Sequence, residues 1–126
     1  MRMKTRYSAI TPYMTRDGSE IRELMHPSAH GNAAQSLAEA TINPGSATRL
    51  HRHHVSEEIY YIVAGDGYMI LGRERFPIAV GDAIGIPPGT PHRVENRGTL
   101  PLRILCSCAP AYSHADTELL ADADPV

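Results

Sequence analysis

Long apolar runs are missing from this sequence of 126 residues. A membrane-spanning helix needs about 18 or more apolar residues in succession, and no segment approaches that length. The basic residues near the start, Arg2 and Lys4, are not followed by the apolar segment that a secretion signal requires. We therefore expect a soluble, unexported protein that resides in the cytoplasm and has no membrane partner.

Excess positive charge is missing as well. The chain has 12 Lys and Arg residues against 14 Asp and Glu residues, a formal net charge of −2, and its basic residues are scattered. Proteins that bind nucleic acids need clustered basic residues. We therefore expect no nucleic-acid partner, and a small-molecule ligand or substrate instead.

Cysteine is scarce, with Cys106 and Cys108 as the only two. Residues two apart in an extended strand are poorly placed to form a disulfide, so reduced thiols in a reducing compartment are expected. Such a pair can bind metal, but without other cysteines the pattern favours two small fillers on one face of a buried strand. Their role stays open.

A chain of this length forms one domain with a modest core and leaves no room for a second. Ten glycines and ten prolines divide it into short runs rich in Ile, Val, Leu, Tyr and Thr, without a helical period of useful length. This pattern predicts an all-β fold. Strands are expected at 19–26, 35–42, 47–54, 57–64, 67–71, 75–80, 83–87, 91–96 and 101–109. Nine short strands at such spacing favour a sandwich or a barrel.

We divide the chain into an N-terminal arm (1–18), a barrel (19–110) and a C-terminal tail (111–126). The arm lacks clear alternation and ends in the turn signal Asp17-Gly18, so we expect it to pack against a neighbouring molecule. The tail contains a helix-compatible piece at 116–124, expected as a surface cap or an interface element.

Two histidines one residue apart, His51 and His53, begin the most informative stretch. In a β-strand they share one face about 7 Å apart, and a turn followed by a second strand would bring Glu58 beside them. The turn-rich segment 87–91 then delivers His92 to the start of another strand. Three imidazoles and a carboxylate suit a divalent transition metal with positions open for water or substrate. A histidine-rich strand can also be solvated surface, and two spaced histidines alone do not decide between these readings.

These two stretches resemble the paired motifs of the cupin superfamily, without a gap. The first motif consists of Gly45, His51, His53, Glu58 and Gly65, and the second of Gly81, Pro87, Gly89, His92 and Asn96. The resemblance covers roughly residues 20–110. It implies an all-β, single-domain jelly-roll barrel, also called a double-stranded β-helix.

The resemblance also implies one bound metal ion with His51, His53, Glu58 and His92 as its ligands. Iron, manganese, nickel, zinc and copper are all compatible with this set. The family spacing favours Glu58 over Glu57, which would replace it if the turn were one residue longer.

The superfamily includes dioxygenases, oxalate-degrading enzymes, isomerases, lyases and proteins that only bind ligands, and fold does not choose among them. Segments 19–25 and 112–120 resemble small cupins labelled mannose-6-phosphate isomerase-like. The complete ligand set favours a metal-dependent enzyme of the dioxygenase, isomerase or lyase type, acting on a small anionic or polyhydroxylated molecule. The lack of an obvious acid–base pair favours the alternative, a noncatalytic cupin that binds or senses a metal or metabolite.

Alternation along the strands predicts which other residues face inward. They are Arg49, Tyr60, Ile62, Val94 and Asn96. The catalytic residues are unknown, and two of these residues are candidates. Arg49 either holds a carboxylate or phosphate of the substrate or pairs with an acid such as Glu39. Tyr60 is either a proton donor or a wall of the cavity.

The other histidines are expected away from the site: His54 points opposite to His53, and His26 and His30 lie in a solvated loop. A homodimer is the expected assembly, with the arm and the 35–42 strand as the open edge through which two copies pair.

Overall fold

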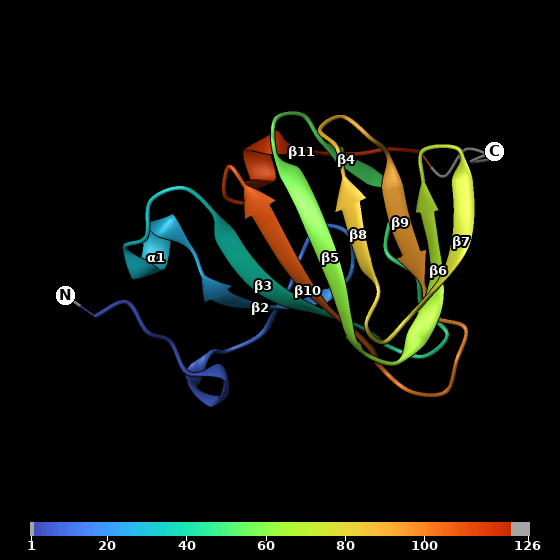
Figure 1. Cartoon of the computed structure of the whole chain (residues 1–126), viewed down its shortest axis with the longest axis horizontal. Helices are drawn as coiled ribbons and strands as arrows, with labels where there is room; N and C mark the ends of the chain where they lie inside the picture. Colours follow the sequence, from blue (N-terminus) through green and yellow to red (C-terminus); the bar gives the residue numbers. More distant parts are fainter. Residues whose placement is uncertain (1, 122–126) are drawn as a thin grey trace.

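Figure 1 shows a computed structural model of the protein, which describes residues 2–121. The strands are β1 (Tyr13–Met14), β2 (Glu20–Met25), β3 (Ser36–Ile42), β4 (His51–His53), β5 (Glu57–Ala64), β6 (Asp66–Leu71), β7 (Glu74–Ala79), β8 (Ala83–Ile86), β9 (His92–Glu95), β10 (Leu102–Ala109) and β11 (Thr117–Leu119). The short helical segments are η1 (Tyr7–Ala9), α1 (Pro27–His30) and η2 (His114–Asp116).

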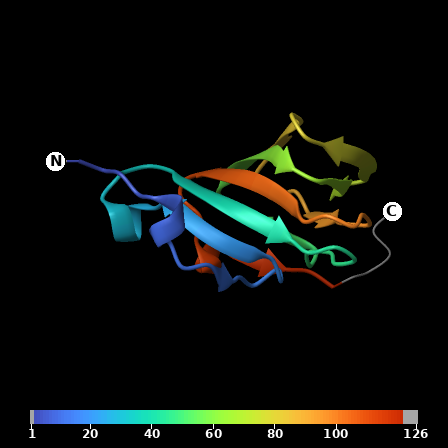
Figure 2. The same cartoon turned by 90° about the horizontal axis from the view of Figure 1, so that it is seen from below.

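The strands form two antiparallel sheets, which confirms the predicted all-β jelly-roll barrel. One sheet has the order β1-β2-β3-β10-β5-β8, and the other has the order β11-β4-β9-β6-β7. Figure 2 shows the two layers separated by the barrel interior. Residues 2–121 contain no helix that could span a membrane.

All nine predicted strands are present, with ends that differ by a few residues. The prediction missed β1 and β11, because strands of two or three residues are too short to show an alternating pattern. The expected loop at 26–32 contains the short helix α1, which begins after His26, whose side chain accepts a hydrogen bond from Ser28 N.

The C-terminal tail differs more from its prediction. Over its described residues, the helix-compatible piece at 116–124 contains the end of η2 and then β11. Strand β11 pairs with β4, which lies far earlier in the chain. Residues 122–124 of this piece lie outside the described part of the chain.

Alternating side chains build the core. On β5 every second residue from Glu58 to Ile62 is buried, whereas Glu57, Ile59 and Tyr61 are exposed. The buried side chains meet those of β10 and β6, including Ile104 and Met69, which have at most 1% of their surface exposed. The four ligands predicted from the sequence are buried as well, and His92 lies beside the core residue Tyr60.

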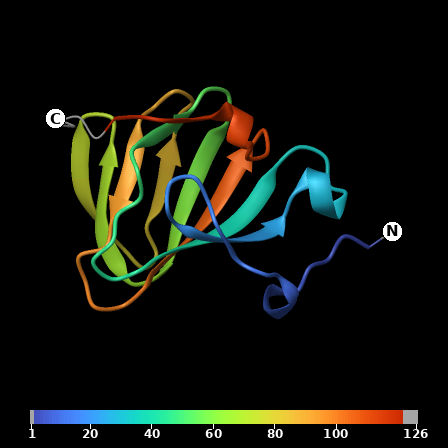
Figure 3. The same cartoon turned by 180° about the vertical axis from the view of Figure 1, so that it is seen from behind.

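The later part of the N-terminal arm folds over its own barrel. Figure 3 shows the segment that precedes β2 looping in front of the barrel. Arg49 N donates to Asp17 O over 2.7 Å, and the Arg16 side chain donates to backbone oxygens of His114 and Thr117. The division into arm, barrel and tail stays a prediction, although arm and tail both pack against the barrel.

The expected open edge at 35–42 is wrong. Strand β3 pairs with β2 on one side and with β10 on the other, so its backbone groups are already used. The pairing of β2 with β3 is a contact that no local pattern in the sequence specifies.

Candidate metal centre

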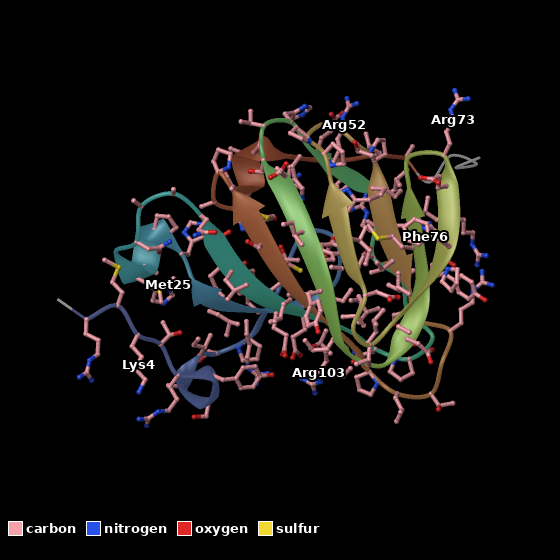
Figure 4. All side chains as sticks on the ribbon, in the orientation of Figure 1. Lys4, Met25, Arg52, Arg73, Phe76 and Arg103 are labelled. Atoms are coloured by element: carbon pink, nitrogen blue, oxygen red, sulfur yellow. The ribbon has the colours of Figure 1, made fainter. Side chains whose placement is uncertain are left out.

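Three histidines from two neighbouring strands meet inside the barrel. Alternation on β4 buries His51 and His53, whereas Arg52 between them extends outward at the rim (Figure 4). Strand β9 pairs with β4 so that His92 lies directly opposite His51, and their ring centroids are 4.3 Å apart. One ring nitrogen from each of the three histidines lies within 4.8 Å of the others.

The outer nitrogen of each ring is already occupied. His51 Nδ1 lies 2.7 Å from Arg49 O, and His92 Nδ1 lies 2.9 Å from Thr90 O. A carbonyl oxygen only accepts, so both Nδ1 atoms carry the proton. In the neutral rings, Nε2 therefore keeps an unshared electron pair directed into the barrel, the form in which histidine binds metal.

The same reasoning applies to the third histidine. His53 Nδ1 lies 2.9 Å from the hydroxyl of Thr117, and that hydroxyl donates its own hydrogen to Ser113 O. It must then accept from His53 Nδ1, which again leaves Nε2 free in the neutral ring. Strand β11 thus fixes the orientation of a candidate ligand on β4.

Glu58 completes the cluster from the opposite sheet. Its Oε1 lies 3.2 Å from His53 Nε2 and 3.5 Å from His92 Nε2. Both Glu58 Oε1 and His92 Nε2 are buried without a hydrogen-bond partner. Electron pairs of a carboxylate and of neutral imidazoles repel one another, so the space between these atoms favours a cation.

The protonation states of Glu58 and His51 suit a metal site. Burial raises the pKa of Glu58, but the imidazoles of His53 and His92 outweigh it and lower this pKa to about 2. Burial, together with the neighbouring His92, lowers the pKa of His51 to about 4, although Asp17 opposes this. His51 is thus neutral near pH 7, as a metal ligand must be.

The donor set fits a divalent transition metal. Three imidazole nitrogens and one carboxylate oxygen form the mixed ligand set typical of zinc, iron, manganese, nickel and copper, whereas calcium prefers oxygen alone. Among the described residues, the group of histidine, cysteine and acidic side chains close enough to share one ion consists of the three histidines. Glu58 adjoins two of them.

A cavity opens from this cluster into the barrel. It contains about 630 Å³ of empty space, its mouth included, and its lining includes His51, His53, Glu58 and Tyr60. Tyr60 is buried with its ring centroid 5.9 Å from that of His92. Burial and the charge of Glu58 raise the pKa of Tyr60 well above its usual range, so its hydroxyl stays protonated.

The structure places most of the inward set as predicted. Ile62, Val94 and Asn96 are buried, and Asn96 fixes the loop after β9 by donating to Ile42 O and Leu100 O. Glu57 is exposed and His54 is half exposed, so neither competes for the site.

The prediction that Arg49 lies beside the metal site is wrong. Its side chain is exposed, because β4 begins only at His51 and the alternation does not extend back to residue 49. Thr48 is buried in its place and lines the cavity. The alternative pairing with Glu39 is also absent, since Glu39 pairs with Arg103 at 3.4 Å.

Several cavity residues were missed because they come from the arm and from β2. Asp17 Oδ2 lies 3.7 Å from His51 Nε2, and Tyr13 and Glu23 line the same cavity. Glu23 Oε1 is buried without a hydrogen-bond partner, and burial raises the pKa of Glu23. Burial and the charge of Glu23 raise the pKa of Tyr13 to about 12. An acidic residue inside a predicted strand was the available signal for Glu23.

Both cysteines are free and buried, as expected for two residues on one face of β10. Both line the cavity, but only Cys108 is more than a filler, because its Sγ donates to Glu58 Oε2 over 3.2 Å. Burial and the charge of Glu58 raise the pKa of Cys108, so this thiol stays protonated.

Sequence comparison places this barrel and its histidine cluster in a known class. The cupin domain family matches residues 38–108, a stretch that includes all four candidate ligands. The chain therefore belongs to the cupin family.

Several relatives are similar over most of their length. An uncharacterized protein of Methanocaldococcus jannaschii is 56% identical over 94% of each chain. An oxalate-binding protein of Thermotoga maritima is 35% identical, over 82% of this chain and 90% of the relative.

Solved structures agree on the fold. A predicted oxalate decarboxylase from Thermotoga maritima superposes with a TM-score of 0.76 and 32% identity, over 86% of this chain and 99% of the other. A polyketide cyclase from Streptomyces resistomycificus has a TM-score of 0.81 over 99% of this chain and 89% of the other, and its 20% identity supports the fold alone.

Proposed function

We propose that the protein binds one divalent transition metal ion through His51, His53, His92 and Glu58, and that the ion holds a small anionic or polyhydroxylated molecule in the cavity. The observation that carries this proposal is the convergence of His92 Nε2 and Glu58 Oε1, both buried and without a hydrogen-bond donor. The ion would supply positive charge to polarise a bound carbonyl, carboxylate or enediol.

We infer that the protein is an enzyme of the dioxygenase, isomerase or lyase type. Two residues that can hold or accept a proton support an enzymatic function. They are Tyr60 and Glu23, which line the same cavity as the histidine cluster. Glu23 is the stronger candidate for proton transfer, since its raised pKa brings it closer to neutral pH. Tyr60 is better suited to donate a hydrogen bond.

Ligand binding without catalysis is the second candidate. It is favoured by the 35% identity with the oxalate-binding protein of Thermotoga maritima. Two measurements on protein loaded with each metal separate the candidates. Turnover of keto-acids, enediols or catechols, followed by oxygen uptake and product analysis, supports the enzyme, whereas saturable binding of oxalate without any turnover supports the binder.

Removal of the ion is expected to leave the barrel folded. The apolar core does not include the ion. Chelation should therefore lower the free energy of unfolding only by the contribution of ion binding, about 3 kcal/mol at an ion concentration of 100 times Kd. Circular dichroism and thermal melting before and after treatment with a chelator measure this. Collapse to an unfolded chain, as for a zinc finger, would contradict it.

We also propose that the protein forms a homodimer through the outer face of its six-stranded sheet. Apolar side chains on that face are exposed, with Leu37 at 38%, Ile59 at 48% and Tyr61 at 45% of their surface. Light scattering after size exclusion is expected to give the mass of two chains of 13.8 kDa, and Ile59→Glu should shift the species to one chain. A single-chain mass for the unaltered protein would contradict the dimer.

A cytoplasmic location is part of the same proposal. Two free cysteines in the barrel support it, because such thiols persist in a reducing compartment.

A further inference from the structure

A buried thiol lies directly beside the carboxylate of Glu58. Strand β10 pairs with β5 so that Cys108 is opposite Glu58, and both side chains point into the barrel. Cys108 Sγ is 3.2 Å from Glu58 Oε2. An ionised carboxylate only accepts hydrogen bonds, so the thiol is the donor.

The two oxygens of Glu58 therefore have different partners. Oε1 lies within 3.5 Å of Nε2 of both His53 and His92, and it has no donor. Oε2 is turned toward β10, where Cys108 engages it. One oxygen of Glu58 thus faces the histidines and the other faces the thiol.

The surroundings hold the thiol in place. Ser36 lies opposite Cys108 on the other neighbouring strand, so Ser36, Cys108 and Glu58 form one row across β3, β10 and β5. The hydroxyl oxygen of Ser36 accepts from Tyr112 N over 2.9 Å, which ties this row to the C-terminal tail. Among the described residues, the cluster able to share an ion contains no thiol.

We propose that Cys108 is a positioning residue of the metal site, whose thiol holds Glu58 Oε2 so that Glu58 meets the ion through Oε1 alone. This inference rests on the proposed metal binding. Without the donor, Oε2 is left buried and unpaired, and the carboxylate turns to find a partner. Loss of such an outer hydrogen bond typically weakens metal binding 10-fold to 100-fold.

Cobalt(II) added to the metal-free protein provides the test. Its affinity is measured by competition with a chelator, and its visible spectrum reports the ligands around the ion. Cys108→Ala should weaken cobalt binding by about 10-fold to 100-fold, and Cys108→Ser, which keeps a donor, should restore most of it. Cys106→Ala is the matched control, because Cys106 is buried on the same face of the same strand but donates only to Ile104 O. This control should bind cobalt like the unaltered protein.

The outcomes separate the inference from the proposed function. Unchanged affinity in Cys108→Ala, or no recovery in Cys108→Ser, would overturn the role of the thiol. A sulfur-to-cobalt charge-transfer band that disappears in Cys108→Ala would also overturn it, since the thiol would then be a ligand. Failure of the unaltered protein to bind cobalt at all would reject the proposed metal site itself. Circular dichroism of each variant verifies that the barrel is folded.

Discussion

Replacing His92 with alanine is expected to abolish metal retention while the barrel stays folded. His92 has none of its surface exposed, and its Nε2 atom is one of the two buried polar atoms of the cluster that lack a partner. Removal of an inner ligand should cost more than the 10-fold to 100-fold loss typical of outer residues. Elemental analysis of the purified variant should therefore fall from about one ion per chain to near zero.

His54→Ala is the matched control for this experiment. His54 follows His53 directly, but its side chain is 50% exposed and pairs with Glu118 outside the barrel. This variant should retain as much metal as the unaltered protein. Full metal content in His92→Ala, or equal losses in both variants, would reject the assignment of the ligands.

Replacing Leu102 with alanine is expected to produce the largest loss of stability that we predict. Leu102 has none of its surface exposed and packs in the core, so truncation leaves a cavity. Buried leucines replaced by alanine lose about 3–5 kcal/mol of unfolding free energy. The melting temperature should fall by roughly 10 °C or more.

Leu100 provides the comparison, because it is the same residue type two positions earlier with 68% of its surface exposed. Leu100→Ala should change the unfolding free energy by less than about 0.5 kcal/mol. Denaturant titrations of both variants measure the difference. Similar losses for the two would mean that the core is not where the strand alternation places it.

The sequence predicted the jelly-roll fold and the meeting of His51, His53, Glu58 and His92 because two motifs with fixed spacing carry the resemblance to cupins. Alternation on β5 separates buried Glu58 from exposed Glu57, and the HxH spacing on β4 places two histidines on one face. The pairing of His51 with His92 could be expected once two complete motifs had been found. Each of these residues lies inside a strand with a clear pattern.

The remainder of the site depends on contacts between distant segments. Asp17 approaches His51, and Thr117 orients His53, from opposite ends of the chain. Cys108 meets Glu58 through the register of β10 on β5, which no local pattern specifies. The prediction for Arg49 was wrong for the opposite reason. The alternating pattern was extended to residue 49, before the start of β4, where it does not hold.

The most direct test of the metal centre is a crystal structure of the untreated protein with anomalous scattering data. One anomalous peak is expected about 2.0–2.3 Å from Nε2 of His51, His53 and His92 and from Oε1 of Glu58. The energy dependence of the peak would identify the element. A peak bound elsewhere, or none in protein purified without chelator, would contradict the proposal that these four side chains share one ion.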